Sequence, residues 1–305
     1  MRTVRSGKPL LVAVAACAVA HATGILVANP VWRYAEVLSL VLLLGYAVVS
    51  GLPQPRWAVP AALTALLVDA VRTMPADPDT GPLGWQVLRP GPTDVDTWAG
   101  FESGLTLCWA SSVAAVVLLA AGRRAGWRRP AVAVAAVAAV AAVAAVAAVA
   151  AALVVGYAVV RVVDVRDAAR AEQRPYAGGA DVADTVTAVG LAVLPAVALG
   201  LTALALAVAL AGQGRWLASA GAVLLALVAL PHLDASIGAV PLPLDAEWSA
   251  AFAWHAITPS LAMPQPVPAL TAAVELTAYL LLVAGLTGAR RSADAAPAQP
   301  AGSRP

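Results

Sequence analysis

Long apolar runs separated by short polar segments extend along almost the whole chain. Runs of about 20 residues recur, the length that a helix needs to cross about 30 Å of hydrocarbon. They lack the strict apolar–polar alternation of barrel strands, so helices are favoured. We therefore predict an all-α integral membrane protein, a polytopic bundle of eight transmembrane helices near residues 9–28, 31–50, 57–74, 101–121, 131–160, 182–211, 216–233 and 269–288.

The composition agrees with a membrane protein. Hydrophobic residues make up 61% of the 305 residues and charged residues 12%, whereas soluble domains carry about 25% charged residues. Cys17 and Cys108 fall inside predicted spans, where they are expected to be small buried hydrophobes. The Ala-, Val- and Arg-rich usage is typical of a GC-rich bacterial genome, so we predict an inner-membrane location. Because many further spans follow the first helix, we expect that helix to be uncleaved.

An arginine-rich segment, residues 122–130, divides the chain into two similar halves. We expect a first four-helix half at 1–121, this hinge, a second four-helix half at 131–291, and a disordered tail at 292–305. The four hinge arginines adjoin two spans, so we expect them to face the cytoplasm and contact anionic lipids, and no nucleic acid. They are Arg123, Arg124, Arg128 and Arg129.

The distribution of charge predicts the orientation. Counted with eight spans, 12 of the 19 basic residues fall on the side of the N-terminus, opposed there only by Asp294. Basic loops mark the cytoplasmic side, so both termini are predicted to be cytoplasmic. The exceptions are Arg161, Arg166, Arg170 and Arg174, which nearby acidic residues balance.

The two halves share features that would fit a parallel 4+4 repeat. Arg56-Trp57 opens the third predicted span and Arg215-Trp216 the seventh, and each half ends in a pair of arginines, Arg123-Arg124 or Arg290-Arg291. Alanine-rich sequences resemble one another easily, so independent origins stay open. The chain is also compatible with a homo-oligomer or a membrane-protein partner.

Three ionisable residues lie well inside predicted spans: His21, Asp69 and Glu275. Ionisable residues within a membrane are costly and usually functional. Each lies roughly 10–15 Å below the predicted outer boundary at 1.5 Å per residue. If their spans meet, they form a polar pocket able to pass protons or hold a cation. Alternatively, Asp69 only pairs with Arg72, three residues further along the helix.

A second set, His232, Asp234 and His255, is predicted at the outer face, with His255 on an interfacial helix at 245–257. Histidines and carboxylates are competent metal ligands. However, no HExxH or CxxC spacing occurs, so no metal site is predicted.

The sequence contains no Walker A loop, dinucleotide-binding fingerprint or GxSxG motif, so no cofactor is predicted. The favoured function is a permease-like protein, or a membrane subunit supporting one, that moves a small solute or proton at the level of His21, Asp69 and Glu275. A helix kink at Pro195 is expected to help. The alternatives are an outer-face enzyme or metal-handling protein using His232, Asp234 and His255, and a non-catalytic scaffold or assembly factor.

Overall fold

The computed structural model describes residues 7–27, 29–73, 95–124, 134–172, 182–240 and 266–294. These residues form helices and no strand, which confirms the all-α prediction for this part of the chain. The elements are α1 (Lys8–Leu26), η1 (Pro30–Arg33), α2 (Tyr34–Ser50), α3 (Ala58–Arg72), α4 (Thr97–Arg124), α5 (Val134–Glu172), α6 (Val182–Ala211), α7 (Trp216–Gly238) and α9 (Pro266–Asp294). Seven helical segments within the described ranges are long and apolar enough to cross a membrane, which indicates a multi-pass membrane protein.

The third predicted span corresponds to the shortest α-helix among the described residues. Helix α3 has 15 residues, or about 22 Å at 1.5 Å per residue, against about 30 Å of hydrocarbon. Its role as an eighth crossing stays a prediction. At the C-terminal end, α9 continues to Asp294, three residues into the tail expected to be disordered, and residues 295–305 lie outside the described part.

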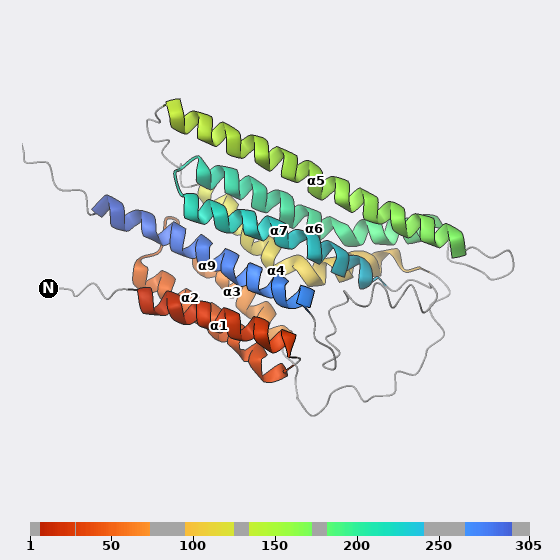
Figure 1. The fold of residues 1–305 in the computed structure, drawn as a ribbon, viewed down its shortest axis with the longest axis horizontal. Coiled ribbons are helices and arrows are strands. Elements are labelled where there is room, and N and C mark those ends of the chain that lie inside the picture. Colours follow the sequence, from red (N-terminus) through yellow and green to blue (C-terminus); the bar gives the residue numbers. More distant parts are fainter. Residues whose placement is uncertain are drawn as a thin grey trace, which may run out of the picture.

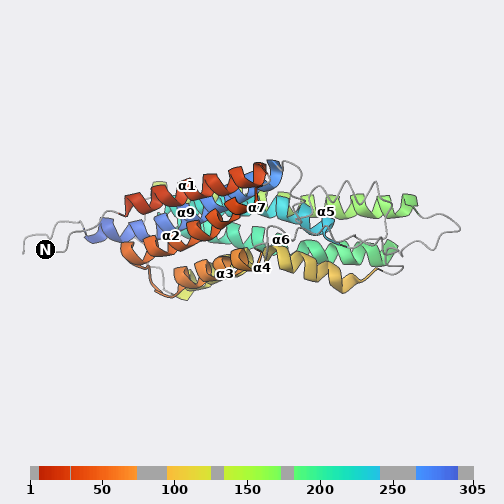
Figure 2. The same cartoon turned by 90° about the horizontal axis from the view of Figure 1, so that it is seen from below.

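The helices lie side by side in an elongated bundle (Figures 1 and 2). The start of α1, the α6–α7 turn and the C-terminal ends of α4 and α9 gather at one end of it (Figure 1). Arg123 and Arg124 lie in the last turn of α4, at this end of the bundle. Arg128 and Arg129 lie outside the described residues. Which end faces the cytoplasm stays a prediction.

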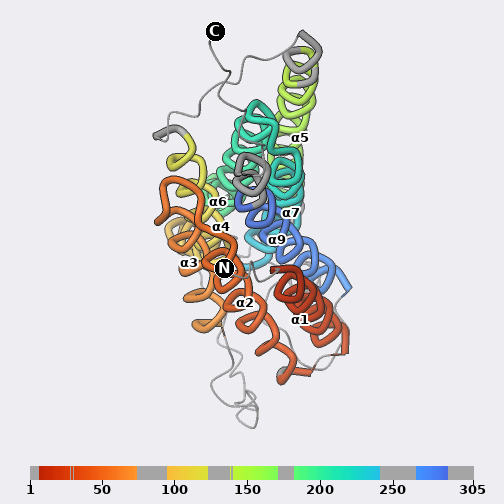
Figure 3. Tube along the Cα trace, turned by 90° about the vertical axis from the view of Figure 1, so that its left-hand side faces the viewer, coloured from red at the N-terminus to blue at the C-terminus, as the bar shows by residue number. Residues whose placement is uncertain are grey.

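Helix α6 forms the centre of the second half and packs against α4, α5 and α7. Its residues Leu199, Leu206 and Leu210 are at most 1% exposed. Helix α5 lies at the edge of the bundle (Figure 3), and Val146 and Leu153 on it are about two-thirds exposed. Pro195 is buried inside α6, which runs as one helix from Val182 to Ala211; the expected kink stays a prediction.

Glycines allow α4 and α6 to approach closely. A Cβ atom on Gly104 would lie 1.9 Å from the carbonyl oxygen of Ala192, and one on Gly100 would lie 2.4 Å from that of Ala188. Small residues four apart are a common device for bringing membrane helices into backbone contact. Because α4 precedes the hinge and α6 follows it, the two predicted halves pack as one bundle.

A second close contact sets α9 against α7. A Cβ on Gly221 of α7 would lie 2.5 Å from the carbonyl oxygen of Ala278, and one on Gly285 of α9 would lie 2.4 Å from the backbone nitrogen of Ala218. This contact fixes the facing surfaces of the two helices, and further along them it brings polar side chains of α7 and α9 together.

Candidate functional site

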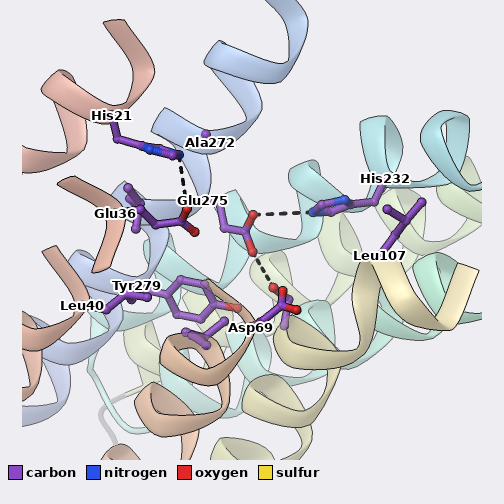
Figure 4. A pocket seen from close by; sticks show the side chains of 12 residues that line it. His21, Glu36, Leu40, Asp69, Leu107, His232, Ala272, Glu275 and Tyr279 are labelled. Atoms are coloured by element: carbon purple, nitrogen blue, oxygen red, sulfur yellow. Dashed lines mark hydrogen bonds and ion pairs between the residues drawn. The ribbon is translucent and has the colours of Figure 1, made fainter. Parts of the chain in front are cut away.

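A cavity of about 100 Å³ lies among α1, α2, α3, α4, α7 and α9 (Figure 4). At about 30 Å³ per water molecule, it has room for roughly three. Its polar lining residues come from all six helices: His21, Glu36, Asp69, Ser111, His232, Glu275 and Tyr279. The remaining lining side chains are apolar, mainly leucines, so the polar groups face one another in a hydrophobic setting.

Glu275 reaches into the centre of the cavity, with His232 on one side and the pair His21–Glu36 on the other (Figure 4). Its Oε2 lies 3.5 Å from Nε2 of His232, and Ser111 Oγ donates a hydrogen bond to its Oε1. The residue is nine positions after the start of α9, about 13 Å along the helix axis. A carboxylate at this depth needs such partners, because an isolated buried charge is strongly unfavourable.

His21 and Glu36 form a second imidazole–carboxylate pair across α1 and α2. Nε2 of His21 lies 3.5 Å from Oε2 of Glu36, and His21 is only 4% exposed. Glu36 belongs to the first turn of α2, where the helix dipole favours a negative charge. The cavity thus holds two pairs of the same chemistry on four different helices.

Asp69 joins this cluster from the last turn of α3. Its Oδ1 accepts hydrogen bonds from Arg72 at 2.9 Å and from the indole Nε1 of Trp109 at 3.0 Å. Arg72 also donates to the carbonyl oxygen of Thr106 at 3.2 Å. Asp69 therefore makes the Arg72 pair that the sequence offered as an alternative, and it also lines the cavity.

Three buried polar atoms at this cavity lack a hydrogen-bond partner among the described residues: His21 Nδ1, His232 Nε2 and the Tyr279 hydroxyl. The 3.5 Å separations in both imidazole–carboxylate pairs are too long for strong hydrogen bonds. Tyr279 is only 2% exposed, and its hydroxyl end lies toward Asp69 (Figure 4). Buried polar groups usually have a hydrogen-bond partner, either protein or water, so these three atoms make the cavity the candidate site of the described residues.

The structure brings the three intramembrane residues of the sequence hypothesis, His21, Asp69 and Glu275, to one cavity. It also brings in residues that the hypothesis did not include: Glu36, Ser111, His232 and Tyr279. The sequence signal for Tyr279 is its spacing of four from Glu275, which places both on one helix face. Ser111 carries no such signal, because a serine in an apolar helix is common.

The two described members of the second predicted set, His232 and Asp234, contact different neighbours. His232 faces Glu275, whereas Asp234 accepts hydrogen bonds from Tyr157 at 2.7 Å and from Nε of Arg161 at 2.9 Å, both on α5. The two side chains point in different directions, because residues two positions apart on a helix differ in direction by about 200°. The predicted outer-face site stays a prediction. His255 lies outside the described residues. Within the described ranges, no three His, Cys, Asp or Glu side chains converge as a metal site.

Comparisons with protein-family models, with curated proteins and with solved structures found no match to this chain.

Proposed function

We propose that this chain is a permease-like membrane protein, or a membrane subunit supporting one, that moves a small solute or proton through the cavity around Glu275. The observation that carries the proposal is the convergence of ionisable side chains from five helices on this one cavity. A charged side chain at the centre of a bilayer costs about 2.5–3.5 kcal/mol or more, and ionisable residues within membrane spans are usually functional. A set that serves packing alone would be replaced at lower cost by apolar residues.

The size of the cavity restricts what can pass. About 100 Å³ accommodates a few water-sized groups, and it is far smaller than the 300–1,000 Å³ of sites for drug-sized ligands. Five of the seven polar lining residues carry groups that exchange protons readily, two imidazoles and three carboxylates. Size and chemistry together favour a proton or a solute of very few atoms.

The proposed setting is a bacterial inner membrane with both termini in the cytoplasm. The basic residues near the predicted cytoplasmic loops support this orientation. Arg123 and Arg124, at the end of α4, would then contact anionic lipid headgroups.

Reconstitution of the full chain into liposomes tests the proposal. Proton entry is followed with a lumenal pH-sensitive dye under an imposed membrane potential, and solute entry by osmotic swelling in urea. Glu275→Gln should reduce whichever flux is present by about tenfold or more. Glu102→Gln, the same change at an exposed position of α4, should leave it unchanged. If neither flux exceeds that of empty liposomes, the proposal is overturned.

A further inference from the structure

We infer that the species handled at this cavity is the proton, and that it is held at two stations, His21–Glu36 and His232–Glu275, beside the unpaired hydroxyl of Tyr279. The inference rests on the proposed function and deepens it by naming the substrate. It also assigns roles to Glu36, His232 and Tyr279.

The inference starts from the balance of charge around the cavity. Three carboxylates line it, and Asp69 has the Arg72 guanidinium at 2.9 Å as its counter-charge. No lysine or arginine is among the described lining residues, and a histidine is the ion-pair partner that the described residues place within 4 Å of Glu36 and of Glu275. A buried carboxylate costs several kcal/mol unless it is paired, and an imidazole supplies a positive charge only when protonated.

Each imidazole–carboxylate pair is therefore neutral when it holds one exchangeable proton. The proton lies either on the ring nitrogen, giving an ion pair, or on the carboxyl oxygen, giving two neutral groups. The two pairs are alike in separation, at 3.5 Å, and together they store two protons. Arg33 also acts electrostatically on His21 and Glu36, and Asp69 acts on Glu36. The two pairs act on each other through Glu275.

The same arrangement argues against a metal cation as the substrate. A hard cation needs several oxygen ligands at once, and the described residues provide no group of three His, Cys, Asp or Glu side chains that could hold one. An imidazole in contact with each carboxylate also competes for it, because the protonated ring repels a cation. A proton requires only the two atoms of each pair.

The Tyr279 hydroxyl can take part in exchange between the stations. Its oxygen can accept a proton from one neighbour while its own proton passes to another, so that one O–H bond forms, one breaks and the residue stays neutral. At a station, the N–H bond of the imidazolium breaks as the O–H bond of the carboxyl group forms. The cavity has room for roughly three water molecules that can bridge distances too long for direct transfer.

Proton flux in liposomes distinguishes the two stations. Glu36→Gln and Glu275→Gln should each lower the flux by about tenfold or more, and Tyr279→Phe by about tenfold, relative to wild type and to Glu102→Gln. If Glu275→Gln stops the flux while Glu36→Gln behaves like Glu102→Gln, the two-station inference is wrong and the proposed function stands. If the wild type moves urea but no protons, the two-station inference is also wrong and the proposed function stands. If the wild type moves neither urea nor protons, the inference and the proposed function are both wrong.

A count of bound protons provides a readout independent of transport. On a jump from about pH 6, where ordinary carboxyl groups have already lost their protons, to basic pH, the purified full chain should release about two more protons than the Glu36→Gln/Glu275→Gln double variant, with the two stations titrating as a coupled system. A difference of one or none overturns the inference. If a glutamine variant does not purify as a monodisperse protein, His21→Asn or His232→Asn removes the same station from the imidazole side.

Discussion

His232 and Asp234 are two residues apart on α7 and contact different neighbours, Glu275 of α9 and Arg161 of α5. One short stretch of α7 thus joins the central cavity to the helix at the edge of the bundle. Without the Asp234 contacts, α5 would be attached mainly through its apolar packing on α6. The ion pair is therefore expected to stabilise the position of α5, with little effect on the cavity.

Asp234→Asn should lower the free energy of unfolding by about 1–3 kcal/mol, because it removes a charge that accepts hydrogen bonds from Tyr157 and Arg161. The Asp234 side chain is 20% exposed, so water replaces the lost contacts poorly. The control is Asp164→Asn, whose side chain is 48% exposed and lies 3.3 Å from Arg161; it should cost less than about 1 kcal/mol. Equal loss in both variants, measured by thermal unfolding in detergent, would contradict the assignment.

Gly104→Ala tests the close approach of α4 and α6. The added Cβ would lie 1.9 Å from the backbone oxygen of Ala192, so the helices must separate, at a cost of about 1–3 kcal/mol. Gly156→Ala on α5 is the matched control, since nothing lies within 4 Å of its Cβ position. There the better helix propensity of alanine should stabilise by about 0.5–1 kcal/mol. Thermal unfolding of both variants should therefore shift in opposite directions.

The helical architecture was predictable because the membrane imposes it on any apolar run of sufficient length. The predicted span 182–211 coincides with α6, and 216–233 lies within α7. The end of α5 at Glu172 was harder to predict from the sequence, since a helix can leave the membrane without any change in its backbone hydrogen bonding. The Gly100/Gly104 spacing is visible in the sequence, but only the structure identifies Ala188 and Ala192 as its partners.

The candidate site was predictable only in part. The cost of burying an ionisable group singles out His21, Asp69 and Glu275 one at a time, whatever their neighbours. Which residues meet depends on helix rotation, and that is why His232 appeared to belong with Asp234 when it faces Glu275. Glu36 was not among the predicted residues, because it lies near the start of its span and its distance from His21 depends on how α1 and α2 pack.

Trp109→Phe tests whether the hydrogen bond from Trp109 holds Asp69 in place at the cavity. The change keeps an aromatic ring beside Arg72, whose Cζ lies 5.7 Å from the centre of the Trp109 ring, but it removes the N–H that donates to Asp69. We expect a loss of about 1 kcal/mol in stability, the usual contribution of a hydrogen bond. Trp98→Phe, at an indole that is 61% exposed, should change stability by less than about 0.5 kcal/mol. A Trp109→Phe variant as stable as Trp98→Phe would show that this bond does not support Asp69.

Whether α3 crosses the membrane decides the orientation of α1 and α2 relative to the helices that follow α3. With 15 residues it is about 8 Å shorter than the hydrocarbon core, a mismatch that costs fractions of a kcal/mol per Å and that local thinning can absorb. A reporter enzyme active only outside the cytoplasm should then be inactive when fused after Gln54, active after Pro90 and inactive after Arg129. A reporter active only in the cytoplasm should give the reverse pattern. If the fusions after Gln54 and Pro90 behave alike, α3 does not cross, the termini lie on opposite sides, and the proposed orientation is wrong.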